Sequence, residues 1–291
     1  MPLTENSYGI IKRLHFIEAV IQQHEPVKVL DVGCGTGNQL TVPLAEKFSG
    51  IKFTGVDSDA QSIESAKNSN SLQNLKFACF QDTGSNEKFD LIIASEVIEH
   101  VEKPEEFLMH LKEKLSDNGK LILTLPNGYG PFEIMSILNS LLHILGIYKV
   151  IGKLRLYEAA KAVKDFFLGS LDPVLSGKAD TLAISPHINF FSYRQICRLI
   201  AGTGLSILQY RPRTFLCGLF FDQLLRGELL LNCNAKIADY LPPGLISDWM
   251  FVLERGESRD SAVYSRGIYA RFHRYINEKA VKKITSELQV N

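Results

Sequence analysis

Short apolar runs rich in β-branched residues alternate with longer amphipathic stretches from residue 27 onward. The apolar runs occupy residues 27–32, 52–56, 75–80, 91–95 and 120–125. The amphipathic stretches, which have an apolar position every three or four residues, occupy residues 39–47, 60–67 and 104–115. This alternation predicts five strands in a doubly wound, mostly parallel sheet with helices on both faces. The expected fold class is therefore α/β.

The regular alternation stops after the fifth predicted strand. Residues 128–190 mix apolar and basic positions and are interpreted as a helical insert. Beyond the insert, helices are predicted at residues 193–202 and 277–288, and strands at residues 205–210 and 248–255. We therefore expect an N-terminal helical segment (1–24), one domain that includes the insert (25–256) and a basic C-terminal tail (257–291).

Composition and charge narrow the classes of partner. Lys and Arg together number 32, as do Asp and Glu, so the chain lacks the broad positive field typical of nucleic-acid binders. Five cysteines without a CxxC pair indicate neither a disulfide framework nor a thiolate zinc site, which favours a reducing cytoplasm. Charged or polar residues interrupt the long apolar stretches, so neither a signal peptide nor a membrane span is predicted. The composition leaves the oligomeric state open.

A glycine-rich turn follows the first predicted strand directly. In VKVLDVGCGTGNQL the turn places Gly33, Gly35 and Gly37 between a strand and a helix. Glycine allows backbone to approach a ligand closely, and the free N–H groups of a helix start favour an anionic or strongly accepting group. Asp57 ends the second strand, twenty residues after Gly37, where a carboxylate can accept hydrogen bonds from both ribose hydroxyls. A nucleotide-like ligand is predicted.

Two departures from the NAD-binding pattern favour a different nucleotide. Asn38 stands where that pattern has its third glycine, and Asp31 adds a carboxylate before the first glycine. With these features, the pair Gln81-Asp82 and the block FDLIIASEVIEHV, residues 25–127 resemble the class I S-adenosylmethionine (SAM)-dependent methyltransferases, which have a Rossmann-like fold.

The resemblance implies how SAM is held. The acid before the glycines contacts the methionine amino group, the glycine turn faces the methionine part, Asp57 binds ribose and Asp82 approaches the adenine amino group. A structural cap is the alternative role for Asp82. The residues assigned to SAM are Asp31, Gly33, Gly35, Gly37, Asp57, Asp82 and Ser95.

Two acids and a histidine follow the fourth strand, at the sheet edge where an acceptor meets the methyl group. Glu96, Glu99 and His100 form an ExxEH group that resembles the ubiquinone-pathway O-methyltransferases, where it is associated with a divalent metal near the acceptor hydroxyl. The resemblance implies either Mg²⁺ acting on an enediol or catechol-type hydroxyl, or His100 as general base. The alternative is an ordinary helix entry in which His100 bonds backbone. These three residues are the catalytic candidates, and the metal ligands stay unassigned.

The insert and the segment after it are expected to form the acceptor side. The insert suits either a helical cap or a lid that touches anionic membrane, so a cytoplasmic protein with peripheral membrane contact is one expectation. The segment HINFF is the other expected pocket wall, and His187 at its start is a further candidate base. Later blocks resemble bacterial methyltransferases of cell-surface polysaccharide synthesis. A quinone precursor, a sugar, a lipid-linked acceptor and another small hydroxylated molecule all remain candidate acceptors.

Oxygen is the expected methyl acceptor atom. The ExxEH group is present, and the fourth strand is not followed by the Asn-Pro-Pro type signature of amino-group methyltransferases. Two rivals remain. One is an NAD-dependent enzyme, which needs the missing third glycine and a Tyr-xxx-Lys pair; the other is a non-catalytic SAM-binding module that contacts a partner or membrane through its insert and basic tail.

Overall fold

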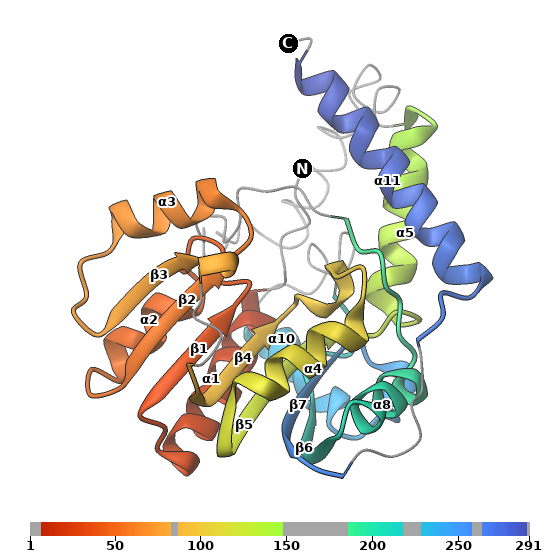
Figure 1. Ribbon diagram of the computed structural model, residues 1–291. Helices are drawn as coiled ribbons and strands as arrows, with labels where there is room; N and C mark the ends of the chain where they lie inside the picture. Colours follow the sequence, from red (N-terminus) through yellow and green to blue (C-terminus); the bar gives the residue numbers. More distant parts are fainter. Residues whose placement is uncertain (1–6, 83–86, 148–185, 218–227, 258–263, 290–291) are drawn as a thin grey trace.

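The computed structural model describes residues 7–82, 87–147, 186–217, 228–257 and 264–289. The basic part of the expected cap or lid, residues 149–164, lies outside these ranges. Within them the strands form one seven-stranded sheet (Figure 1). The strands are β1 (Lys28–Val32), β2 (Lys52–Asp57), β3 (Leu75–Cys79), β4 (Phe89–Ser95), β5 (Leu115–Pro126), β6 (Leu205–Pro212) and β7 (Asp248–Arg255).

The strand order is β3-β2-β1-β4-β5-β7-β6. The first five strands run parallel to one another, and β7 is antiparallel to both β5 and β6. This confirms the predicted doubly wound, mostly parallel sheet. The chain moves outward from β1 in one direction and returns to add β4 on its other side. Such a reversal opens a crevice at the carboxyl ends of the two central strands, where ligands of α/β sheets bind.

Helices cover both faces of the sheet (Figure 1). Side chains of α1, α2 and α3 join one hydrophobic cluster, and side chains of α4 and α8 join the other. The α-helices are α1 (Ser7–His24), α2 (Thr41–Lys47), α3 (Ala60–Ser69), α4 (Pro104–Lys114), α5 (Pro131–Ile144), α8 (Tyr193–Gly202), α10 (Glu228–Ala238) and α11 (Ile268–Gln289). The 3₁₀ turns are η1 (Phe80–Asp82), η2 (Ile98–His100) and η3 (Pro243–Leu245).

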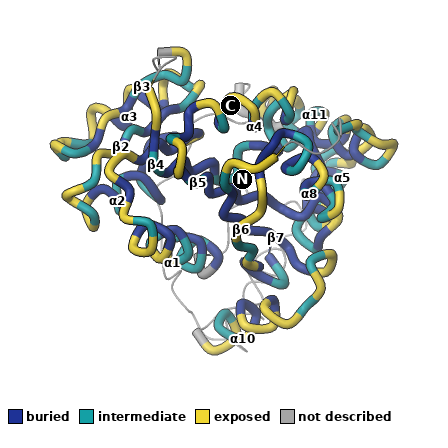
Figure 2. Tube along the Cα trace, turned by 60° about the horizontal axis from the view of Figure 1, so that its bottom comes forward, coloured by how far each residue is buried: buried dark blue, intermediate teal, exposed yellow. Residues whose placement is uncertain are grey.

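Strand β4 shows how the sequence sorts its side chains between the two layers. Leu91 and Ile93 pack with the α1 side, whereas Ile92 and Ala94 pack with the α4 side. Successive side chains of a strand point to opposite faces, so an uninterrupted apolar run is required where both faces are covered. Figure 2 shows the central strands as buried along their length. The apolar run therefore fixes β4 as a core strand and brings its polar end to the crevice.

The C-terminal helix α11 lies alongside α5, at the edge of the molecule (Figure 1). It begins at Ile268 and not at Asn277, because its buried face starts earlier in the sequence than the tail's charge pattern indicates. Ser140 donates a 3.2 Å hydrogen bond to Asn277, and Lys283 donates to the carbonyls of the last turn of α5. The basic tail therefore contains a packed helix. No helix in the described ranges has the length and apolar character needed to cross a membrane.

Candidate functional site

The glycine turn after β1 depends on backbone conformations that other residues rarely adopt. Gly33, Gly35 and Gly37 have φ values of 76°, 55° and 74°. A Cβ added to Gly33 would also lie 2.4 Å from Cγ2 of Val97, so the turn and the segment after β4 are in close contact. The sequence places glycine here because both the dihedral angle and the space exclude a side chain.

The two predicted acids at this turn are held by different partners. The Asp57 carboxylate accepts 2.8 Å hydrogen bonds from the backbone N–H of Gly35 and from that of Asp59. Asp31 is buried and accepts a 2.6 Å hydrogen bond from the Thr41 hydroxyl, which ties β1 to α2. Both carboxylates therefore brace the glycine turn. Contact of either with SAM stays a prediction, and the Asp82 side chain lies outside the described residues.

A narrow cleft opens beside the glycine turn. It is lined by Arg13, Asp31, Gly33, Cys34, Leu40 and Ser95. The cleft thus brings together three of the residues predicted to bind SAM. Arg13 is 5% exposed and donates a 3.1 Å hydrogen bond to the Ser95 hydroxyl from helix α1. Sequence analysis did not identify Arg13, although a basic residue on the apolar face of a predicted helix was a signal for it.

A chain of hydrogen bonds leads from this cleft into the sheet. The hydroxyls of Ser95 and Thr124 lie 2.9 Å apart, and Thr124 donates a 2.7 Å bond to Glu96. Glu96 also lies 3.2 Å from the Arg213 guanidinium. Burial acts to raise the pKa of Glu96, but Arg213 and Arg13 hold it below the ordinary value, so the carboxylate is ionised. The backbone of Glu96 has φ 58°, a left-handed conformation that is strained for a non-glycine residue.

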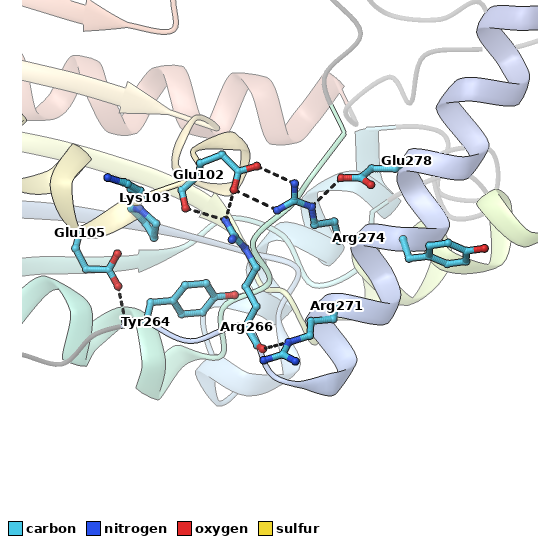
Figure 3. Close-up of a pocket in the computed structure, with 10 residues that line it drawn as sticks. Glu102, Lys103, Glu105, Tyr264, Arg266, Arg271, Arg274 and Glu278 are labelled. Carbon is cyan, nitrogen blue, oxygen red and sulfur yellow. Dashed lines mark hydrogen bonds and ion pairs between the residues drawn. The ribbon is translucent and has the colours of Figure 1, made fainter.

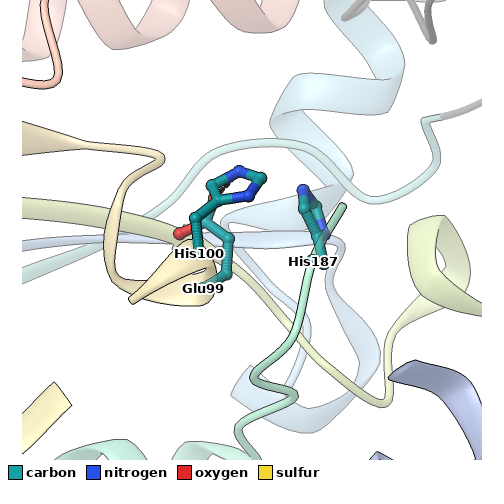
Figure 4. A group of neighbouring side chains, drawn as sticks. All are labelled: Glu99, His100 and His187. Atoms are coloured by element: carbon teal, nitrogen blue, oxygen red, sulfur yellow. Dashed lines mark ion pairs between the residues drawn. The ribbon is translucent and has the colours of Figure 1, made fainter. Parts of the chain in front are cut away.

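The other two members of the ExxEH group meet a residue from beyond the insert. Glu99 and His100 of η2 lie against His187, and their ligand atoms lie within 4.8 Å of one another (Figure 4). Glu99 is 1% exposed, and neither carboxylate oxygen has a hydrogen-bond partner among the described residues. Burial, together with the nearby Glu96 charge, raises the pKa of Glu99 to about 8. Sequence analysis named His187 as a candidate, but its contact with His100 required the tertiary structure.

Both imidazoles of this cluster are oriented through Nδ1. His100 Nδ1 lies 3.1 Å from the carbonyl oxygen of Pro186, and His187 Nδ1 lies 2.6 Å from Oε1 of Glu133. Burial lowers the pKa of His100 to about 4; burial also opposes charge on His187, but Glu133 raises the pKa of that ring to about 9. With Nδ1 engaged, Nε2 is the atom that each ring offers to a ligand.

Glu133 was missed by the sequence analysis. It lies in the first turn of α5 and its side chain is fully buried. An acidic residue in the otherwise apolar stretch PFEIMSILNSLL was the available signal, because a buried carboxylate needs a charged or polar partner. The identity of that partner, His187, depends on the contact between α5 and a residue 54 positions later in the chain, and it was not readable from spacing.

A larger, solvent-open cavity of about 580 Å³ lies between the start of α4 and α11 (Figure 3). Its Glu102 accepts hydrogen bonds from both Arg266 and Arg274, and Arg274 also bonds Glu278. These acidic and basic side chains are therefore paired with one another. The ion pairs connect the start of α4 with α11, and the cavity shares no lining residue with the cleft beside the glycine turn.

Comparison with known proteins gives one family match and several relatives. The model of a methyltransferase domain family matches residues 4–210. The ubiquinone biosynthesis O-methyltransferase of Rickettsia canadensis (strain McKiel) is 32% identical over 147 residues, which are 46% of this chain and 61% of that protein. The mitochondrial ubiquinone biosynthesis O-methyltransferase of Schizosaccharomyces pombe (strain 972 / ATCC 24843) is 36% identical over 122 residues, which are 38% of this chain and 43% of that protein. The match thus spans less than two thirds of either relative.

Among solved structures, PKMT2 from Rickettsia typhi in complex with AdoHcy superposes with a TM-score of 0.50. The superposition covers 81% of this chain and 50% of that one, at 19% sequence identity. At this identity the likeness concerns the fold.

Proposed function

This chain belongs to the methyltransferase domain family, and from that premise we propose that it transfers the methyl group of SAM to an oxygen of a small hydroxylated acceptor. The observation that carries the proposal is the end of β4. Ser95 faces the cleft of Asp31 and Gly33, while Glu99 and His100, a few residues later, join His187 in a second polar cluster. One short segment thus carries a donor side and an acceptor side.

SAM supplies a methyl group already activated by its positive sulfur, so the protein has mainly to bind and align it. On the donor side, we assign the Arg13 guanidinium to the methionine carboxylate and Asp31 to the amino group, because both side chains line the cleft beside the glycine turn. We assign Asp57, at the end of β2, to the ribose hydroxyls, and the glycines of the turn let the backbone approach the ligand closely. Asp82 keeps its expected role near adenine.

A divalent cation fits the acceptor side. The fit rests on Glu99, whose two buried oxygens lack hydrogen-bond partners within the described chain, and on the two imidazoles whose Nδ1 atoms are already engaged. Glu99, His100 and His187 would hold the cation, and Glu96 is instead paired with Arg213. Two imidazole donors favour Mn²⁺, Fe²⁺ or Zn²⁺ over Mg²⁺. Such a cation would lower the pKa of an acceptor hydroxyl.

A lipid-soluble or lipid-linked acceptor is part of the same proposal. Helix α5 exposes Ile134 and Leu138, and the residue that follows it, Leu145, is also exposed, with exposed fractions of 58%, 46% and 69%. Apolar side chains of this kind, next to a basic segment, support peripheral contact with a membrane by a cytoplasmic protein. Flotation with anionic and neutral vesicles tests the contact: protein that stays with neither vesicle contradicts it.

The activity test uses SAM labelled with tritium in its methyl group. Chelator-treated protein is incubated with a catechol-type compound, a sugar, an aromatic amine or no acceptor, with and without added Mn²⁺ or Mg²⁺. We expect label on the catechol-type oxygen, with transfer restored better by Mn²⁺ than by Mg²⁺. Label on the amine contradicts oxygen as the acceptor atom. Tight SAM binding without transfer to any acceptor would favour a non-catalytic SAM-binding module.

A further inference from the structure

A second layer of buried side chains lies behind His187. Oε1 of Glu133 is 2.6 Å from His187 Nδ1, and Oε2 of the same carboxylate is 3.5 Å from Nε2 of His273. Glu133 and His273 are both fully buried. One carboxylate from α5 therefore lies between an imidazole of the acceptor cluster and an imidazole of the C-terminal helix.

His273 is itself held firmly. Its ring stacks on Phe190, with 3.9 Å between ring centroids and 18° between ring planes. Phe190 lies three residues after His187, so the same short segment carries the cluster histidine and the stacking partner of His273. Burial lowers the pKa of His273 to about 3, which keeps this ring neutral. The side chain therefore fills a fixed place beside Glu133 without adding a charge.

Helix α11 also reaches the other half of the cluster. Arg266, just before α11, donates a 3.0 Å hydrogen bond to the side-chain oxygen of Asn189. Asn189 in turn donates to the carbonyls of Ile98 and Val101, which flank Glu99 and His100. Two residues near the start of the C-terminal helix thus contact the cluster indirectly. Arg266 is linked to η2 through Asn189, and His273 is linked to His187 through Glu133.

We propose that Glu133 is a positioning residue that aims the Nε2 atom of His187 at Glu99 and His100, and that His273 of α11 fixes Glu133 in turn. The proposal rests on the acceptor-side part of the proposed function. A carboxylate bonded to Nδ1 of a ligating histidine fixes its tautomer and ring orientation and raises its basicity. Glu133 has this relation to His187, and the complete burial of the Glu133 side chain keeps water from replacing the carboxylate.

The structure explains why a carboxylate is kept in an apolar helix. An ionised group buried without a partner is costly, and His187 is the partner that Glu133 has at hydrogen-bond distance. In the free protein the Nδ1 atom of His187 and the Glu133 carboxylate satisfy each other's hydrogen-bonding capacity. When Nε2 of His187 binds a cation, the charge on Glu133 faces the ligated ring and continues to favour it. The contact between Glu133 and His187 is therefore favourable both in the free protein and when Nε2 of His187 binds a cation.

The test measures binding of Mn²⁺ alone to the chelator-treated full chain by calorimetry, for wild type, Glu133→Gln, Glu133→Ala and His273→Phe. The matched control is Ser140→Ala, which breaks a different buried contact between α5 and α11. SAM affinity and the melting temperature are measured for each variant. We expect Glu133→Ala to weaken Mn²⁺ binding by about 10- to 100-fold. Glu133→Gln should lose less, because its amide oxygen still accepts from Nδ1–H, and His273→Phe should lose about threefold.

We expect Ser140→Ala to bind Mn²⁺ like wild type, and every variant to bind SAM within about twofold of wild type, since the donor side is formed by other residues. Mn²⁺ affinity unchanged in both Glu133 variants, or lowered equally in Ser140→Ala, would overturn the positioning role. Wild type that transfers methyl groups but binds no Mn²⁺ would overturn it as well and leave the transferase proposal intact. Wild type that binds Mn²⁺ but not SAM would remove the transferase proposal, and the comparison of variants would still decide the role of Glu133.

Discussion

Arg213 donates to the Asp248 carboxylate across 2.7 Å, and both side chains are at most 4% exposed. Arg213 follows β6 and Asp248 begins β7, so the pair joins the two antiparallel strands at the end nearest the site. The same guanidinium lies 3.2 Å from Glu96. One buried cation therefore serves a buried carboxylate, Asp248, and a partly buried one, Glu96. Thr214 donates a further 2.9 Å hydrogen bond to Asp248.

Replacement of this cation should be among the most destabilising single changes in the chain. Arg213→Met leaves the buried Asp248 and the partly buried Glu96 without their guanidinium, and we expect a loss of about 3–5 kcal/mol in the free energy of unfolding. Urea denaturation at neutral pH measures it. Adding Asp248→Asn to Arg213→Met should recover part of the loss, because it removes one of the two uncompensated charges. A double variant less stable than Arg213→Met would contradict this explanation.

The glycine turn predicts a contrast between two glycine-to-alanine changes. In Gly33→Ala the new Cβ would lie 2.4 Å from Val97 Cγ2, and the backbone at this position has φ 76°. We therefore expect a loss of about 1–3 kcal/mol in the free energy of unfolding. Gly50→Ala is the matched control, because a Cβ there has no neighbour within 4 Å. It should change stability by less than about 0.5 kcal/mol. Chemical denaturation compares the two, and equal losses would show that the turn does not require glycine at position 33.

Removal of the Asp57 carboxylate should weaken SAM binding. The side chain accepts a hydrogen bond from Gly35 N–H and, in the proposed function, binds the ribose hydroxyls, so Asp57→Ala should raise the Kd for SAM at least about tenfold. Asp59→Ala is the control: it removes the N-cap of α3, which accepts from Ser62, and should cost about 1 kcal/mol of stability without changing the Kd. Calorimetric titration measures both. A Kd unchanged in Asp57→Ala would remove this residue from the SAM site.

The ion pairs of Glu102 predict a dependence of stability on pH. A hydrogen bond and charge from Arg274, with Arg266 nearby, lower the pKa of Glu102 below its ordinary value of 4.5. A lowered folded-state pKa contributes stability above pH 4.5, and this contribution disappears as the pH falls from there through the folded-state value. Because Glu102 is 62% exposed, Glu102→Gln should cost below about 1 kcal/mol at pH 7 after solvent screening.

The measurement for Glu102 is thermal unfolding of wild type and Glu102→Gln between pH 7 and pH 3, at low and high salt. The difference between them should shrink with acid and with salt. Glu106→Gln serves as control: it removes an exposed ion pair between the first turn of α4 and Lys103, the residue before the helix, and should change stability less. A difference that grows as the pH falls has the wrong sign and would contradict the assignment.

The sequence by itself determined the elements whose signals are local. Short apolar runs predicted β1 to β5, and patterns of period 3.6 predicted their helices, because burial on both faces of a strand or on one face of a helix fixes where apolar residues stand. The patterns at residues 205–210 and 248–255 also correspond to strands in the structure, β6 and β7. Four features of the site were recognisable because each lies at the end of a single strand or just after it: the glycine turn, Asp31, Asp57 and the ExxEH group. The start of α11 was predicted at residue 277, nine residues too late. The many basic residues of this segment are typical of a solvated tail and hid the face that packs against α5.

Tertiary structure decided the contacts between residues far apart in the chain. Periodicity identifies a buried face but not the element that covers it, so the entry of β7 between β5 and β6 was not predictable from the pattern. For the same reason the sequence grouped Glu96 with Glu99 and His100. In the structure Glu96 forms an ion pair with Arg213, and His187 lies beside Glu99 and His100 instead. Arg13, Glu133 and His273 take their places through side-chain packing between separate elements, which no spacing along one segment encodes.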